Sequence, residues 1–233
     1  MPEDFYLAVP ADAANGPWPG VVVLHDAFGF RGDVRGQADR FAERGYLALA
    51  PNLYAHCRGP SCLLSVYRGA VTGRGAAFAS IESARQNLVA RPDCTGQVGM
   101  VGFCMGGGYA VISAPRFDFA AASINYGKVP EDAADALRGS CPVVASFGRK
   151  DGYSGRAAQR LETALTSLGV AHDVREYETL GHGFLNELPR FMQSGLNPMN
   201  LVLNIHLRDE TAIEDAWRRI FAFFDTHVRG AQN

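Results

Sequence analysis

The segment GFCMGG holds a cysteine, Cys104, in a setting suited to a nucleophile. An apolar run at 97–102 precedes it and small residues follow it, which predicts a strand that turns directly into a helix. Gly102 and Gly106 leave room for the main chain to make that turn. This pattern is a nucleophile elbow with cysteine in the central position. A buried structural cysteine is the alternative, because free cysteine is often buried and inert.

The predicted place of Cys104 also suits the negative charge of a thiolate. The first N–H groups of a helix lack partners within the helix and favour negative charge nearby. The backbone N–H of Met105, the residue after the nucleophile, can point at the oxyanion that forms when a thiolate attacks a carbonyl. Cys104 and Met105 are therefore candidates for the nucleophile and for one donor of an oxyanion hole.

An acid and a histidine follow where they can complete a catalytic triad. Asp151 comes just after the apolar run 141–148, and His182 follows the run 172–178. The carboxyl ends of parallel strands meet at one edge of a sheet, where ligands bind. The order Cys104, Asp151, His182 is the order of the α/β-hydrolase triad along its chain. Taken singly, Asp151 would be a turn residue and His182 a loop histidine, but together they predict a triad.

Short apolar runs alternate with amphipathic segments and supply the elements that would position these residues. The runs are predicted strands at 20–26, 46–54, 97–102, 117–127 and 141–148, and the alternating segment 172–178 is predicted to be the last strand. The segments at 31–45, from 77, from 154 and from 211 are predicted helices. This alternation predicts an α/β fold with a mostly parallel central sheet and helices on both faces. Without repeats or linkers, residues 1–233 are expected to form one domain.

Helix starts and loops carry further signals. Asp33 can cap the first predicted helix, and Thr211 with Glu214 fits a capping box for the last one. Residues 57–75, rich in Gly, Ser and Arg, are expected to form a loop or short irregular elements. Residues 186–209 form an insertion that we interpret as a lid, an oligomer contact or a mobile loop.

Composition excludes some classes of protein. The chain has 233 residues, of which 47% are hydrophobic, and a formal net charge of −2, so no basic excess indicates a nucleic-acid partner. No apolar run reaches the roughly 18 residues that span a bilayer, and the first residues lack a secretory pattern. A soluble, cytoplasmic protein without a membrane partner is expected.

The five cysteines are irregularly spaced and odd in number, which argues against a disulfide framework. Cys57 and Cys62 lie close together, and we expect them to be ordinary loop residues. A redox pair or half a metal site is the alternative, although no second pair or nearby histidine completes a zinc pattern.

At the triad residues the chain resembles the dienelactone hydrolase family, a branch of the α/β-hydrolases. The resemblance lies in the elbow GFCMGG, the GRKDG and GHGF segments, and the runs VVVLHDAFGF and ADRFAERGYLALAPNLY. It covers about residues 18–185 and, more loosely, the last helix. It implies a single α/β-hydrolase domain with little or no cap, and hydrolysis of lactones and small esters through an acyl-cysteine, without a metal or cofactor.

The resemblance also implies roles for two residues of the first strand–loop. An acidic residue of that loop contacts the resting thiol in the family, and Asp26 occupies its place, where glutamate is frequent. A turn-forming aspartate is the alternative. The backbone N–H of Ala27 would then pair with that of Met105 in the oxyanion hole.

The chain departs from the family in its substrate-binding arginines. Family members that act on dienelactone hold the substrate carboxylate with arginines, one of them shortly after the catalytic histidine. Here that stretch holds Leu185 and Asn186 instead. For the remaining arginine and for the pocket lining, the candidates are Arg58, Arg68, Arg74, Arg190 and Tyr126, each of which can equally be a surface or structural residue. The resemblance thus favours a hydrolase without specifying dienelactone as substrate.

Two interpretations without ester hydrolysis stay open at this point. The first is a non-catalytic protein of the same fold that binds a ligand or partner in the pocket, although such a protein has no reason to keep Cys104, Asp151 and His182 together. The second is an oxidation-sensitive thiol at Cys104, although no partner cysteine is near in sequence. The oligomeric state has no sequence signal.

Overall fold

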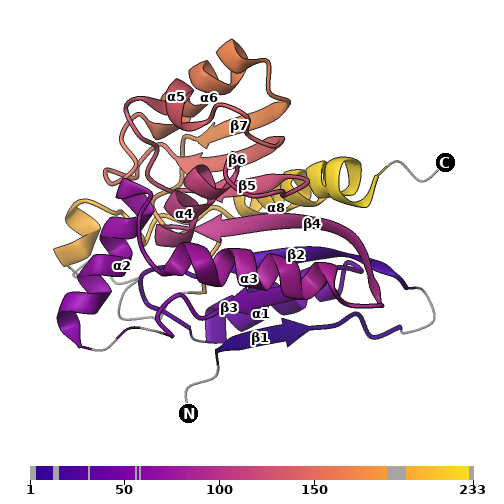
Figure 1. Ribbon diagram of the computed structural model, residues 1–233. Helices are drawn as coiled ribbons and strands as arrows, with labels where there is room; N and C mark the ends of the chain where they lie inside the picture. Colours follow the sequence, from indigo (N-terminus) through magenta and orange to yellow (C-terminus); the bar gives the residue numbers. More distant parts are fainter. Residues whose placement is uncertain are drawn as a thin grey trace.

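Seven strands form one sheet in the computed structural model, which describes residues 4–12, 16–30, 32–55, 57, 59–187 and 198–230. The strands are β1 (Phe5–Ala8), β2 (Trp18–Leu24), β3 (Leu47–Pro51), β4 (Cys94–Phe103), β5 (Ala122–Asn125), β6 (Val143–Gly148) and β7 (His172–Tyr177). Their order across the sheet is β1-β3-β2-β4-β5-β6-β7. Only the β1–β3 pair is antiparallel among the strands described. The prediction of an α/β fold with a mostly parallel sheet is confirmed (Figure 1).

Helices cover both faces of this sheet (Figure 1). They are α1 (Gly32–Ala42), α2 (Pro60–Thr72), α3 (Ala77–Val89), α4 (Met105–Ser113), α5 (Ala133–Ala136), α6 (Ala157–Leu168) and α8 (Glu210–Phe224), with short turns of helix at η2 (Pro198–Leu201) and η3 (Asp225–Arg229). The apolar side chains of α1 and α8 pack on one face, and those of α2, α3, α4 and α6 pack on the other.

The central strand β2 illustrates why these runs are apolar without alternation. It is buried along its whole length. Val21 and Val23 belong to the core under α1 and α8, whereas Val22 and Leu24 belong to the core on the opposite face. Successive side chains of a strand point to opposite faces, so a strand covered on both faces must be apolar at every position.

Helix α8 buries one apolar stripe, but it begins earlier than predicted. Its first residue is Glu210, and the carboxylate of the N-cap residue Asp209 accepts a hydrogen bond from Ala212 N at 3.2 Å. The predicted capping box at Thr211 and Glu214 is therefore wrong. An aspartate two residues before Thr211 provides the acceptor that the helix start requires.

The segment expected to be a loop is instead the helix α2, and a disulfide joins Cys57 and Cys62 at its start. The expectation of ordinary loop cysteines is therefore wrong. Gly69, one of the glycines that suggested a loop, lies inside α2 against α4. A side chain there would approach the hydroxyl oxygen of Tyr109 to 2.5 Å. The glycine thus serves close helix packing, which local sequence does not distinguish from a loop signal.

The edge strand β1 was not predicted either. It has four residues and pairs with β3 from Phe5 opposite Pro51 to Ala8 opposite Ala48. A run this short carries too little periodicity to indicate a strand.

Among the helices of the described residues, none is both long enough and apolar enough to cross a membrane.

Candidate active site

Cys104 lies at the turn between β4 and α4 with φ 55° and ψ −111°. A positive φ strains a residue with a side chain, and such strain persists where the surroundings fix the backbone. Here the Cys104 N–H donates to the carbonyl of Asn125 at 3.0 Å. A Cβ atom on Gly102 would clash with the backbone of Gly106, and one on Gly106 would clash with the carbonyl of Leu24. The two glycines are therefore what allows the elbow to form.

Asp151 and His182 form a buried pair at the same edge of the sheet, after β6 and β7. Nδ1 of His182 donates to Oδ2 of Asp151 at 2.7 Å. Oδ1 of Asp151 accepts from the N–H of Tyr153 at 2.9 Å, and the Ser154 hydroxyl donates to Oδ2. These partners fix the carboxylate and the tautomer of the ring, which leaves Nε2 of His182 for Cys104, the other titratable group beside it.

The charge of His182 depends on the nucleophile beside it. Burial alone would lower the pKa of His182, but the electrostatic interaction with Cys104 and the hydrogen bonds with Asp151 and Cys104 raise it to about 10. The imidazole ring lies between the rings of Tyr126 and Tyr153, with both centroids 5.1 Å away in edge-to-face geometry. The site therefore favours the charged imidazolium of His182, and the two neighbouring rings pack against it.

The loop after β2 places Asp26 at this edge and is anchored by His25. Nδ1 of His25 donates to the Asp26 carbonyl at 2.7 Å, and Nε2 accepts from Leu53 N at 3.0 Å. Burial lowers the pKa of His25 to about 4, so this ring is neutral near pH 7 and serves as a structural link to the end of β3. Oδ1 of Asp26 accepts from Phe28 N at 2.8 Å.

Asn186 joins Asp26 to a second carboxylate. Its Nδ2 donates to Asp26 Oδ2 at 3.1 Å and to Asp33 Oδ2 at 2.5 Å, and its Oδ1 accepts from the Tyr126 hydroxyl at 2.5 Å. Asp33 Oδ1 accepts from Glu187 N at 2.7 Å. Asp33 was predicted to cap a helix, and this is wrong, because α1 already begins at the residue before it. Burial raises the pKa of Asp33, and it raises the pKa of Asp26 to about 6.

Tyr54 connects the two loops that hold the candidate oxyanion donors. Its hydroxyl donates to the carbonyl of Ala27 at 3.0 Å and lies 3.4 Å from Sδ of Met105. The glycine contact between α4 and the end of β2 brings the same two loops together. Ala27 and Met105, named from the sequence, are thus in neighbouring segments next to Cys104.

A cavity of about 190 Å³ opens onto these residues. Its lining residues are Asp26, Ala27, Phe28, Tyr67, Cys104, Tyr153, His182, Gly183, Asn186, Leu203 and Ile205. Leu203 and Ile205 follow η2 and belong to the described part of the predicted insertion. His182 N donates to the Leu203 carbonyl at 2.7 Å. The insertion therefore packs on the loop that carries the histidine and walls the cavity.

The other predicted binding residues lie elsewhere. Arg68 and Arg74 are exposed and do not line the cavity. Arg58 and Arg190 fall outside the described residues. Tyr126 is fully buried behind His182 and meets Asn186 instead of the cavity.

Several residues of the site were missed from the sequence. Tyr153 and Asn186 follow the predicted acid and histidine closely, so their nearness to the motifs was an available signal. Tyr67, Leu203 and Ile205 had no such signal, because only the packing of α2 and of the insertion brings them to the cavity.

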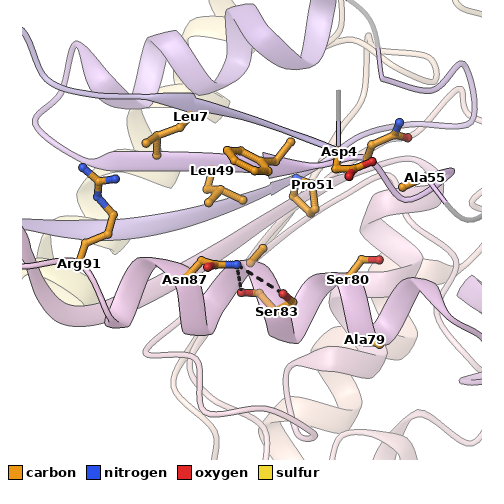
Figure 2. Close-up of a pocket in the computed structure, with 13 residues that line it drawn as sticks. Asp4, Leu7, Leu49, Pro51, Ala55, Ala79, Ser80, Ser83, Asn87 and Arg91 are labelled. Carbon is orange, nitrogen blue, oxygen red and sulfur yellow. Dashed lines mark hydrogen bonds between the residues drawn. The ribbon is translucent and has the colours of Figure 1, made fainter. Parts of the chain in front are cut away.

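A larger groove of about 540 Å³ lies at the other edge of the sheet, between β1, β3 and α3 (Figure 2). Leu7 and Leu49 lie on its strand side, and Ser83 and Asn87 lie on its helix side. It shares no lining residue with the cavity at Cys104. The described residues also contain no cluster of three or more metal-ligating side chains.

Comparisons with known proteins identify a family that matches nearly the whole chain. The model of a family described as the dienelactone hydrolase family matches residues 4–228. A carboxymethylenebutenolidase of Rhodococcus opacus is 26% identical over 247 residues, which span 96% of this chain and 86% of that protein. A putative carboxymethylenebutenolidase of a Synechocystis strain is 26% identical over 248 residues, spanning 96% and 92%.

Solved structures of dienelactone hydrolase-like proteins have a similar fold. A putative dienelactone hydrolase from Klebsiella pneumoniae superposes with a TM-score of 0.72 at 23% identity, covering 95% of this chain and 92% of that chain. A dienelactone hydrolase-like promiscuous phosphotriesterase from metagenomic libraries has a TM-score of 0.70 at 25% identity, covering 94% and 90%.

Proposed function

We propose that this chain, which belongs to the dienelactone hydrolase family of α/β-hydrolases and is a carboxylic ester hydrolase, cleaves small lactones or esters through an acyl-cysteine on Cys104. Cys104, His182 and Asp151 act as nucleophile, acid–base and orienting carboxylate. The relatives named carboxymethylenebutenolidase favour a lactone among the candidate substrates.

The first half-reaction forms the thioester. The Cys104 thiolate attacks the carbonyl carbon, and the N–H groups of Ala27 and Met105 stabilise the oxyanion of the tetrahedral intermediate. The intermediate collapses with cleavage of the C–O bond, and the leaving oxygen takes a proton from Nε2 of His182. Asp151 stabilises the imidazolium before this transfer and orients the ring throughout.

The second half-reaction releases the acid. His182 removes a proton from water, the hydroxide attacks the thioester carbonyl, and cleavage of the C–S bond restores the thiolate. A thiolate leaves more readily than an ordinary alkoxide, so the first intermediate tends to return to substrate. Esters with good leaving groups, such as enol lactones and aryl esters, are therefore the best substrates.

One observation carries the proposal. The strained backbone of Cys104 presents its side chain to the same cavity as the ring of His182, whose other nitrogen is bound to the buried Asp151. A structural cysteine requires neither the positive φ nor the fixed histidine. The placement therefore supports a nucleophile over the buried-thiol and redox interpretations.

The test compares initial rates of p-nitrophenyl acetate hydrolysis by wild type, Cys104→Ala and Cys94→Ala. Cys94, a cysteine without a disulfide at the start of β4, is the matched control. We expect Cys104→Ala to lose about 1000-fold or more in rate, because loss of a nucleophile removes covalent catalysis, and Cys94→Ala to keep the wild-type rate. Mass spectrometry of a quenched reaction should find the acyl group on the peptide that contains Cys104. Equal rates in wild type and Cys104→Ala would contradict the proposal.

A further inference from the structure

Negative charge dominates the wall of the cavity next to the nucleophile. Asp26 lines the cavity, and Asp33 lies directly behind it, because one Nδ2 group of Asn186 donates to both carboxylates. Two carboxylates that share a single neutral donor receive no positive charge from it. Neither arginine nor lysine is present among the described residues that line this cavity.

Two cations of the described residues contact backbone groups of the cavity wall and are committed to partners there. Nζ of Lys128 donates to the Tyr153 carbonyl at 2.5 Å and lies 4.3 Å from the centre of the Tyr153 ring, behind the cavity wall. Nη1 of Arg208 donates to the Asn186 carbonyl at 3.3 Å, and its Nε lies 3.7 Å from Glu210. Neither side chain lines the cavity.

The remaining titratable groups around Asp26 and Asp33 do not cancel the negative charge of these two carboxylates. His182, which lowers the pKa of Asp26 by its charge, is paired with the carboxylate of Asp151 and also interacts with Cys104. Tyr54 and Tyr126 face the carboxylates as neutral phenols, since burial raises the pKa of both. Glu187 adds a further negative charge beside Asp33.

A substrate with its own carboxylate would meet two penalties in this cavity. It would lose water in a small space walled by Phe28, Leu203 and Ile205, and it would be repelled by the carboxylates of Asp26 and Asp33. A substrate of the same shape without charge meets neither penalty. The repulsion acts where both carboxylates are ionised, which for Asp26 is above about pH 6.

We propose that the cavity selects uncharged esters or lactones and rejects those that carry a carboxylate on the acyl side, with Asp33 and Asn186 as specificity-determining residues that act through Asp26. This inference rests on the proposed function, since it names the substrate class of the same site. Asn186 binds Asp26, and Asp33 raises the pKa of Asp26 by its charge, but neither residue holds a reacting atom.

The test uses two acyl esters of one shape. These are p-nitrophenyl adipate, which ends in a carboxylate, and p-nitrophenyl adipamate, which ends in the isosteric neutral amide. At about pH 8 we expect kcat/KM to favour the amide by about tenfold or more, a difference of about 1.4 kcal/mol. Equal values, or a preference for the acid, would overturn the inference and leave the hydrolase intact. Hydrolysis of p-nitrophenyl acetate but of neither adipyl ester would overturn this inference alone, whereas hydrolysis of none of the three esters would overturn the proposed function and this inference with it.

Two further measurements test whether the carboxylates of Asp33 and Asp26 cause the preference for the neutral ester. Asp33→Asn should lower the preference for the amide at least about threefold, whereas Asp39→Asn, on the same helix α1 and bound to the Tyr6 hydroxyl, should leave the ratio of the two kcat/KM values unchanged. In wild type, the same ratio should fall between pH 8 and about pH 5.5, as Asp26 takes up a proton. This second measurement requires no variant, so a misfolded Asp33→Asn would still leave the test complete. A ratio that is independent of pH would contradict the role of the carboxylates.

Discussion

At the scale of the residue, Asp26 is a carboxyl group that the fold keeps buried, although its charged form is more stable in water. Its side chain is buried, with 7% exposure for the residue, and its pKa rises to about 6 because burial disfavours the charged form. The bonds from Phe28 N and Asn186 Nδ2 offset part of that cost. Functional sites often contain such groups, since selection for activity tolerates a local loss of stability.

A prediction follows for the pH dependence of stability. A folded pKa above the unfolded value means that the contribution of Asp26 is complete below about pH 4 and is lost as pH rises through about 6. The free energy of unfolding of Asp26→Asn, taken relative to wild type, should therefore increase by up to about 3 kcal/mol between pH 4 and pH 8, so that the variant becomes relatively more stable. Urea unfolding at both pH values measures it. A difference that stays constant would show that the charge of Asp26 costs the fold nothing.

At the scale of the element, the elbow depends on how closely α4 approaches the end of β2. Gly106 faces the carbonyl groups of Leu24 and His25, and a side chain there cannot fit without moving α4. Since α4 begins at the residue after Cys104, any such movement displaces the nucleophile. The strand–turn–helix unit is therefore rigid for a steric reason.

Substitution of alanine at two glycines tests this reason. Gly106→Ala should lose about 3 kcal/mol of stability and most of the ester hydrolysis, because the added methyl group meets backbone atoms. Gly36→Ala is the matched control: Gly36 lies in α1 with open space around its Cα, so alanine should raise stability by up to about 1 kcal/mol. Thermal unfolding and p-nitrophenyl acetate rates measure both. A stable, active Gly106→Ala would contradict the close approach.

At the scale of the whole molecule, the cavity is closed by parts far apart in the chain. Tyr67 of α2 reaches across to Tyr153, with 2.7 Å between the two hydroxyl oxygens. Leu203 and Ile205 cover the opposite side from the segment after η2. Gly152 N, beside the acid, donates to the carbonyl of that segment at Val202. The size of the acyl group that fits is therefore decided by long-range packing.

Shortening a side chain of this wall should change acyl-chain preference. Ile205 is 3% exposed, whereas Leu201, four residues earlier in the chain, is 86% exposed and serves as the control. Ile205→Ala should raise the ratio of kcat/KM for p-nitrophenyl hexanoate over the acetate about fivefold, and it should lower stability by about 2 kcal/mol. Leu201→Ala should change neither quantity. A folded Ile205→Ala with the wild-type ratio would exclude this residue from the acyl site.

Local sequence determined the central part of this protein. The apolar runs that became β2, β3, β4 and β6 were predictable because a strand covered on both faces must be apolar throughout, and β7 was predictable from its alternating pattern. The elbow at Cys104 and the places of Asp151 and His182 were predictable because each lies beyond the carboxyl end of a predicted strand. These features depend on neighbours in sequence, so the sequence displays them.

Tertiary structure decided the rest. Gly69 carried a local signal for a loop, but it lies inside α2, where it allows close packing against α4. Asp33 carried a local signal for a helix cap, but its carboxylate instead accepts hydrogen bonds from Asn186 and Glu187. The walls of the cavity join segments whose approach no local pattern encodes. The charge and the size of the candidate substrate pocket are set by those long-range contacts, because they decide which side chains are buried together.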